Sequence, residues 1–140
     1  MATEYRSGCP ISLTQELLGD RWTLLILRGI VSADRRHFRE LLRGSKEGLT
    51  SSILADRLDR LLDAGILTRR ADPTHKQKVI YTLTAAGIDL VPVLARIGIW
   101  GATLCHAHPD LAAAAHDLDY AMPDTWVSLM STLRTTHDPA

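Results

Sequence analysis

Two groups of polar side chains lie near the middle of this 140-residue chain, and both have the chemistry to contact a polyanion. The first is the hydroxyl triplet Thr50, Ser51 and Ser52, which comes directly before a leucine-rich segment. The second is a set of cations that begins at Arg69 and ends at Lys78. Small hydroxyl residues at the start of a helix let its backbone come close to DNA, and the helix dipole there favours phosphate. Together the two groups indicate a nucleic-acid ligand.

The distribution of charge points the same way. The formal net charge is zero, but residues 35–80 hold eleven basic and six acidic side chains, a net charge of +5, whereas residues 81–140 hold two and six. The middle of the chain is therefore a basic island. A solvated basic face is the other explanation for an excess of this size.

The hydroxyl triplet is expected to begin a helix. Thr50 is a suitable N-cap residue, and Gly65 is expected to end the helix. One half of its helical wheel is apolar, with Ile53, Leu54, Leu58, Leu61 and Leu62. The other half is polar or small, with Ser52, Ala55, Asp56, Asp59, Arg60 and Asp63. If the triplet served folding alone, it would be no more than a helix cap.

The cations are expected on a β-hairpin. Two strands, ILTRRA and KVIYTL, flank the turn residues DPTHKQ. In the second strand, the period of two predicts Val79, Tyr81 and Leu83 inward and Ile80 and Thr82 outward. The remaining elements are expected to be helices over residues 10–18, 21–31 (where β-branched residues leave a strand possible), 37–44, 85–106, 110–121 and 125–136. Thr84 is expected to cap the long helix and Pro92 to kink it.

Two helices joined by a short turn and followed by a hairpin are typical of a winged helix-turn-helix, whose second helix fits the major groove of DNA. The chain also resembles a known family in four stretches that keep their order and spacing: CPISLTQELLGDRWTLLILRGI, RRHFREL, GLTSSILADRLDRLLDAGIL and VIYTLTAAG. They resemble the HxlR-type branch of the MarR-like winged-helix bacterial transcription regulators, over about residues 9–101. The resemblance implies a mainly α fold with a small β-hairpin, and a dimer that binds double-stranded DNA.

On this resemblance, the helix that begins near Thr50 enters the major groove and residues 72–78 form the wing. The expected DNA-binding residues are Arg36, Arg39, Thr50, Ser51, Ser52, Ala55, Asp56, Arg60, Arg70, His75, Lys76 and Lys78. Asp56 has two possible uses: it accepts a hydrogen bond from a cytosine amino group, or it orients Arg60 at i, i+4 spacing. Arg57, at the edge of the apolar face, serves either packing or phosphate contact.

The family forms its dimers through terminal helices, which map here onto residues 10–18 and 84–104. The expected interface residues are Ile11, Leu17, Leu18, Leu90, Leu94, Ile97, Trp100 and Leu104. We therefore expect a DNA-binding domain with its dimerisation helices over residues 1–101 and an additional helical segment over residues 102–140.

Two sulfur-containing sites have other possible uses. Cys9 lies at a helix start, where the dipole lowers a thiol pKa, and some relatives of this type sense oxidants or electrophiles through a cysteine near this place. The alternative is an inert cysteine. Cys105, His106 and His108, with His116, offer metal-ligand atoms but match no standard zinc spacing, so we expect no metal and no cofactor.

Four aromatic side chains, Trp22, Trp100, Tyr120 and Trp126, either line an effector pocket or pack in the core and interface. Enzyme chemistry is the weakest hypothesis, because no nucleophile and base pair, Gly-rich phosphate loop or paired carboxylates in motif spacing are found. No run of 18 apolar residues occurs. We expect a cytoplasmic, dimeric regulator that reads a palindromic operator, has no membrane partner and responds to a small molecule or electrophile. A winged-helix module that binds protein is the alternative.

Overall fold

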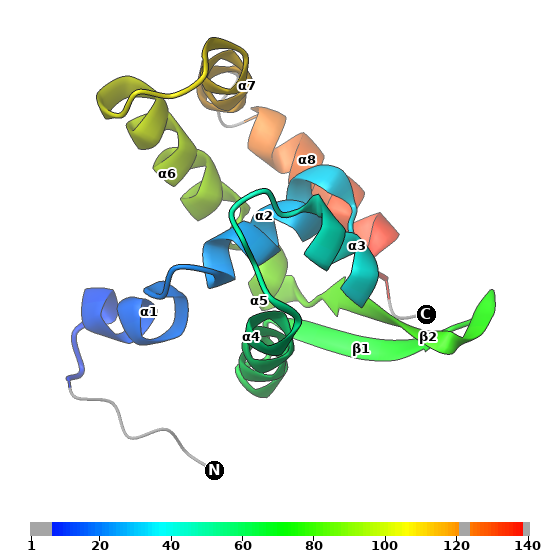
Figure 1. Cartoon of the computed structure of the whole chain (residues 1–140). Coiled ribbons are helices and arrows are strands. Elements are labelled where there is room, and N and C mark those ends of the chain that lie inside the picture. Colours follow the sequence, from blue (N-terminus) through cyan, green and yellow to red (C-terminus); the bar gives the residue numbers. More distant parts are fainter. Residues whose placement is uncertain (1–6, 121–123, 139–140) are drawn as a thin grey trace. The chain divides into compact units, whose positions relative to one another are not determined.

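The computed structural model describes residues 7–120 and 124–138, which form eight helices and one two-stranded sheet (Figure 1). The chain divides into two compact units. The first comprises Met1–Ala64 and Arg70–Ile80, and the second comprises Gly65–Arg69 and Tyr81–Ala140. The hairpin is thus shared, with its tip in the first unit and its base in the second.

The first unit contains α1 (Pro10–Leu18), α2 (Thr23–Ala33), α3 (Phe38–Gly44) and α4 (Ser51–Asp63). Its buried apolar side chains are Leu18, Ile26, Leu27, Ile30, Leu41, Leu54, Leu58 and Leu61. Helix α2 begins at Thr23, two residues later than expected, and residues 23–31 are helical rather than extended, because a helix that is apolar nearly all round is suited to a central position. The strand considered as an alternative there is wrong.

Helix α4 begins and ends where its sequence predicts. The hydroxyl of Thr50 accepts a hydrogen bond from the backbone N–H of Ile53 at 3.3 Å, as an N-cap does. Gly65 follows the helix with a φ of +74°, a left-handed conformation that favours glycine. Leu54, Leu58 and Leu61 are at most 1% exposed, and each contributes about 2 kcal/mol by its burial.

The hairpin consists of β1 (Leu67–Asp72) and β2 (His75–Leu83). The predicted alternation along β2 is wrong, because Val79 is 38% exposed and Thr82 only 5%. Residues 75–79 are exposed on both faces of the ribbon, and residues 81–83 are buried on both faces. Burial therefore changes along the strand instead of from face to face.

The second unit contains α5 (Ala85–Ile88), α6 (Val91–Leu104), α7 (Pro109–Tyr120) and α8 (Asp124–Thr136). Thr84 caps α5 by accepting a hydrogen bond from the N–H of Gly87 at 3.1 Å, as predicted. The single kinked helix expected over residues 85–106 is wrong, since α5 and α6 are separate helices. Pro92 lies in the first turn of α6, where its missing N–H breaks no intrahelical hydrogen bond.

Candidate nucleic-acid interface

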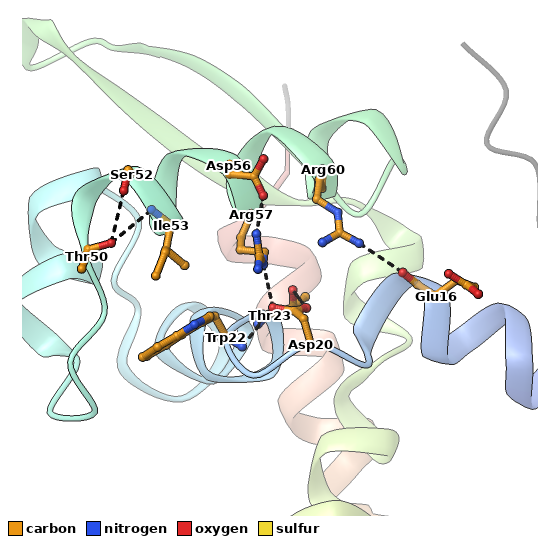
Figure 2. Close-up of polar contacts among 10 residues, drawn as sticks. All are labelled: Glu16, Asp20, Trp22, Thr23, Thr50, Ser52, Ile53, Asp56, Arg57 and Arg60. Atoms are coloured by element: carbon orange, nitrogen blue, oxygen red, sulfur yellow. Dashed lines mark hydrogen bonds and ion pairs between the residues drawn. The ribbon is translucent and has the colours of Figure 1, made fainter.

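The hydroxyl end of α4 is accessible to a ligand. Thr50, Ser51 and Ser52 are all exposed, as are Ala55 and Asp56 one turn further along. Figure 2 shows Ser52 and Asp56 on the side of α4 away from Asp20, while Ile53 and Arg57 point toward α2. The helix thus keeps its leucine side in the core and leaves its polar side for a partner.

Arg57 braces α4 against the start of α2. Its Nε donates a hydrogen bond to a carboxylate oxygen of Asp20 at 2.7 Å (Figure 2). The same carboxylate accepts hydrogen bonds from the backbone N–H groups of Trp22 at 3.0 Å and Thr23 at 3.2 Å. It also accepts one from the Thr23 hydroxyl. Partial burial alone would raise the pKa of Asp20, but the hydrogen bonds from Thr23, Arg57 and Trp22 lower it to about 2. The sequence left the role of Arg57 open between packing and phosphate contact. The structure gives it the packing role.

Of the two uses considered for Asp56, the pairing with Arg60 is wrong. Asp56 pairs instead with Arg57, and the Arg60 guanidinium donates to the backbone carbonyl of Glu16 on α1 at 3.2 Å (Figure 2). Arg57 reaches both carboxylates because its guanidinium lies between Asp20 and Asp56, whereas Arg60 extends toward α1. Asp56 therefore balances the charge of Arg57, while its own exposed side chain stays on the polar side of α4.

The turn between α3 and α4 is held from behind by α2. Arg28 of α2 forms an ion pair with Glu47 at 3.1 Å, and Glu47 also accepts hydrogen bonds from Ser45 and from the backbone N–H of Lys46. Gly48 has a φ of +87°, which lets the chain reverse before Thr50. These contacts set the geometry of the helix-turn-helix.

Three arginines of the first unit are candidates for contact with phosphate. Arg39 and Arg70 are exposed and Arg36 is half-buried. Burial lowers the pKa of Arg36; nearby Asp34 opposes this shift, and the positive charge of Arg70 adds to it. Arg36 is therefore affected by the charge of Arg70 as well as by that of Asp34.

The wing tip exposes His75, Lys76 and Lys78. The turn before them is organised by Asp72, whose carboxylate accepts from the backbone N–H and the hydroxyl of Thr74 at 2.8 and 2.7 Å. These hydrogen bonds, with one from His37, hold the pKa of Asp72 well below its ordinary value. No periodicity in the sequence marks Asp72 or His37 as part of the site.

The thiols of Cys9 and Cys105 are free and exposed. Backbone hydrogen bonds from Ser12 and Ile11, at the start of α1, lower the pKa of Cys9. Within residues 7–120 and 124–138 no group of three or more potential ligands could hold a metal ion. The His116 side chain lies outside the described part of the chain.

The predicted aromatic set is only partly described. Trp22 is half-buried with the Arg21 guanidinium 5.4 Å from its ring centroid, and Trp100 is 62% exposed. The side chains of Tyr120 and Trp126 lie outside the described residues. Both uses considered for these four side chains, an effector pocket or packing in the core and interface, stay predictions.

A capped helix with an exposed polar side, preceded by a second helix and followed by a cationic hairpin, defines the winged helix-turn-helix class. The family model described as HxlR-like helix-turn-helix matches residues 17–109. This chain belongs to that family, whose curated relatives are transcriptional regulators.

Two curated relatives illustrate the similarity. The HTH-type transcriptional regulator YodB of Bacillus subtilis is 34% identical over 89 residues, which cover 64% of this chain and 78% of YodB. An uncharacterised HTH-type transcriptional regulator of Synechocystis is 35% identical over 86 residues, which cover 61% of this chain and 62% of the relative. The match thus spans less than two thirds of the Synechocystis protein.

Solved structures show the same fold. The reduced form of YodB from B. subtilis has a TM-score of 0.57 and 30% identity, covering 71% of this chain and 97% of that one. The redox regulator HypR in its oxidised form has a TM-score of 0.62 and 25% identity, covering 71% and 100%. The predicted winged-helix fold and HxlR-type family are confirmed.

Proposed function

We propose that this protein is a cytoplasmic, dimeric transcription regulator that binds double-stranded DNA, with no catalytic role. The start of α4 enters the major groove, and the wing tip at residues 72–78 contacts the sugar-phosphate backbone. The observation that carries this proposal is the division of α4 into a leucine side in the core and an exposed side that begins with three hydroxyl residues. A helix used for packing alone needs no such accessible start.

The side chains proposed to contact DNA divide by chemistry. Thr50, Ser51, Ser52, Ala55 and Asp56 are small or polar and approach base edges, with Arg60 behind them. The cations Arg36, Arg39, Arg70, His75, Lys76 and Lys78 contact phosphates, which fix the register of the protein on the duplex. The high positive charge of residues 35–80 supports this assignment.

We propose that a second copy of the chain packs against the apolar face of α6. Ile97, Trp100 and Leu104 are 47%, 62% and 66% exposed and follow each other at helical spacing, and Ile11 of α1 is 81% exposed. Leu17, Leu90 and Leu94 are half-buried and stay in the proposed interface. Leu18 is 5% exposed in its own chain, so we remove it from the interface.

The stretch Ala85–Leu104 is, by length and composition only, apolar enough to cross a membrane. A helix that packs in a soluble protein meets the same criterion, and α5 and α6 are separate helices here. We therefore assign its apolar character to the subunit interface. A palindromic operator would follow from the two-fold symmetry of such a dimer.

Residues 102–140 are proposed to be an additional segment that follows a DNA-binding domain at residues 1–101. The family match ends at residue 109, so α8 and nearly all of α7 lie beyond it. In the second unit α7 packs against α6, and α8 packs against α5. The backbone N–H of Leu83 donates to Nδ1 of His137 at 2.8 Å, which ties the end of the chain to the hairpin base.

Selection of bound fragments from random duplex DNA, with purified protein at a stated salt concentration, tests the function. We expect a palindromic consensus whose half-sites lie about one helical turn apart. A protein-binding winged helix would enrich no sequence, and its residual DNA affinity would depend on charge alone. That result would overturn the proposal.

Replacing both Lys76 and Lys78 by alanine should weaken binding to the consensus and to random duplexes by about the same factor. Each lost phosphate contact should also reduce the slope of log affinity against log salt by about 0.9. Fluorescence anisotropy at several salt concentrations measures both quantities. Arg134→Ala on α8 is the matched control and should keep the wild-type slope; an unchanged slope in the double variant would remove the wing from the interface.

Cys9 is the proposed redox or electrophile sensor. Its exposed thiol has a lowered pKa, and solved relatives include a redox regulator. A Cys9→Ser protein should keep its DNA affinity under an electrophile that releases the wild type, whereas Cys105→Ser should be released like the wild type. Band-shift assays with and without the electrophile measure this difference. Equal release of the wild type and Cys9→Ser would show that Cys9 is inert.

A further inference from the structure

A histidine links the helix-turn-helix to the wing. His37 immediately precedes α3, and its Nε2 lies 2.8 Å from a carboxylate oxygen of Asp72, 35 residues away in the chain. Its Nδ1 forms a hydrogen bond with the carboxylate of Glu40 in the first turn of α3. Asp72 is 6% exposed and His37 is 25% exposed, so the contact with the wing lies largely out of solvent.

The protonation state of this histidine follows from its partners. Ionised carboxylates only accept hydrogen bonds, so both ring nitrogens of His37 must carry a proton for both contacts to form. The hydrogen bond with Asp72 raises the pKa of His37, burial opposes it, and Glu40 raises it further, leaving the pKa above its ordinary value. The charged imidazolium is therefore the form that fits the site.

We propose that His37 is a positioning residue for DNA binding: its imidazolium clamps Asp72 to the start of α3 and so fixes where the wing tip lies. The inference rests on the proposed function. Asp72 also accepts both hydrogen bonds from Thr74, which directly precedes the exposed residues His75 and Lys76. The position of the wing tip therefore depends on one proton on His37, which lies 35 residues before Asp72 in the sequence.

The sign of the pH dependence follows from the raised pKa. The clamp is complete when the pH is below about 6.5, the ordinary histidine pKa, and is lost as the pH rises through the higher pKa of His37 in the folded protein. Neutral His37 has one N–H for two carboxylates, so either Asp72 or Glu40 then faces a ring lone pair. The charged groups that act on His37 are those of Glu40 and Asp72, and Arg36, adjacent to it in sequence, is affected by the charges of Asp34 and Arg70.

The test measures DNA affinity against pH by fluorescence anisotropy at constant salt, between about pH 5 and about pH 8. All variants carry His75→Gln, because His75 is a second histidine in the wing tip. We expect affinity for the selected consensus to fall by about three- to tenfold as the pH rises. Adding His37→Gln should remove that step, and adding Asp72→Asn should move its midpoint to lower pH.

An NMR titration of the His37 ring protons in the free protein separates the clamp from the function. We expect a His37 pKa above its ordinary value, which Asp72→Asn lowers and the control His106→Gln leaves unchanged. A His37 pKa at its ordinary value, or an affinity step that His37→Gln leaves intact, would overturn the inference. If no duplex binds at any pH, the proposed function fails, whereas the NMR titration still shows whether the clamp forms.

Discussion

Asp20→Ala is expected to lower the free energy of unfolding by about 2 to 3 kcal/mol, because a pKa of about 2 lies nearly two units below the ordinary value for aspartate. Asp20 is 18% exposed and holds together the first turn of α2 and the guanidinium of Arg57 on α4. Its removal leaves two backbone N–H groups and a half-buried cation without this partner. Urea denaturation at neutral pH measures the change.

The pH dependence of stability offers a second measurement of the same contact. Asp20 has a lowered pKa, so its contribution is present above about pH 4, the unfolded value, and is lost as the pH falls toward about 2. The wild type should lose stability over this range more steeply than Asp20→Ala. Asp59→Ala, an exposed change on α4, is the control and should stay within about 0.5 kcal/mol of the wild type.

A double-mutant cycle of Asp20→Ala and Arg57→Ala isolates the pair. Residues in direct contact typically show coupling energies of about 0.5 to 3 kcal/mol, and we expect a value in the upper half of that range because the pair is more than three-quarters shielded from solvent. If Asp20→Ala were as stable as Asp59→Ala, the brace between α2 and α4 would have no energetic role.

Local signals in the sequence predicted most of the fold. The cap at Thr50, the stop at Gly65 and the cap at Thr84 each depend on residues within four positions, and all three are present in the structure. The strand alternation along β2 failed because burial there depends on what the hairpin packs against, which a period of two does not contain. From the sequence, Pro92 predicts a kink, because the end of α5 at Ile88 leaves no mark in the pattern.

The sequence predicts the exposed residues of the candidate site but not the ion pairs that hold its helices and hairpin in place. The polar side of α4 follows from the position of its leucines, whereas Asp20 with Arg57 and His37 with Asp72 join residues 37 and 35 positions apart. No periodicity connects such pairs. Leu18 was assigned to an interface because an apolar helix side has the same pattern whether it faces its own core or a second subunit.

Ser52→Glu is expected to weaken DNA binding by about tenfold to a hundredfold, or about 1.4 to 2.7 kcal/mol, without destabilising the protein. Ser52 is exposed, and its hydroxyl lies 3.3 Å from that of Thr50, so a longer side chain at this position meets solvent rather than the core. A carboxylate in the first turn of a helix is favoured by the dipole, so the free energy of unfolding should stay equal or rise by a few tenths of a kcal/mol.

The same carboxylate would face phosphates in the proposed complex, and its repulsion decreases as salt screens it. The affinity deficit of Ser52→Glu should therefore shrink at higher salt, whereas a deficit caused by lost hydrogen bonds alone would not. Ser131→Glu on α8 adds the same charge outside the residues proposed to contact DNA and should bind like the wild type. Ser52→Ala separates the loss of the hydroxyl from the added charge. Wild-type affinity in Ser52→Glu would mean that the start of α4 does not enter the groove, because a carboxylate added there without a paired cation would be repelled by both phosphate strands.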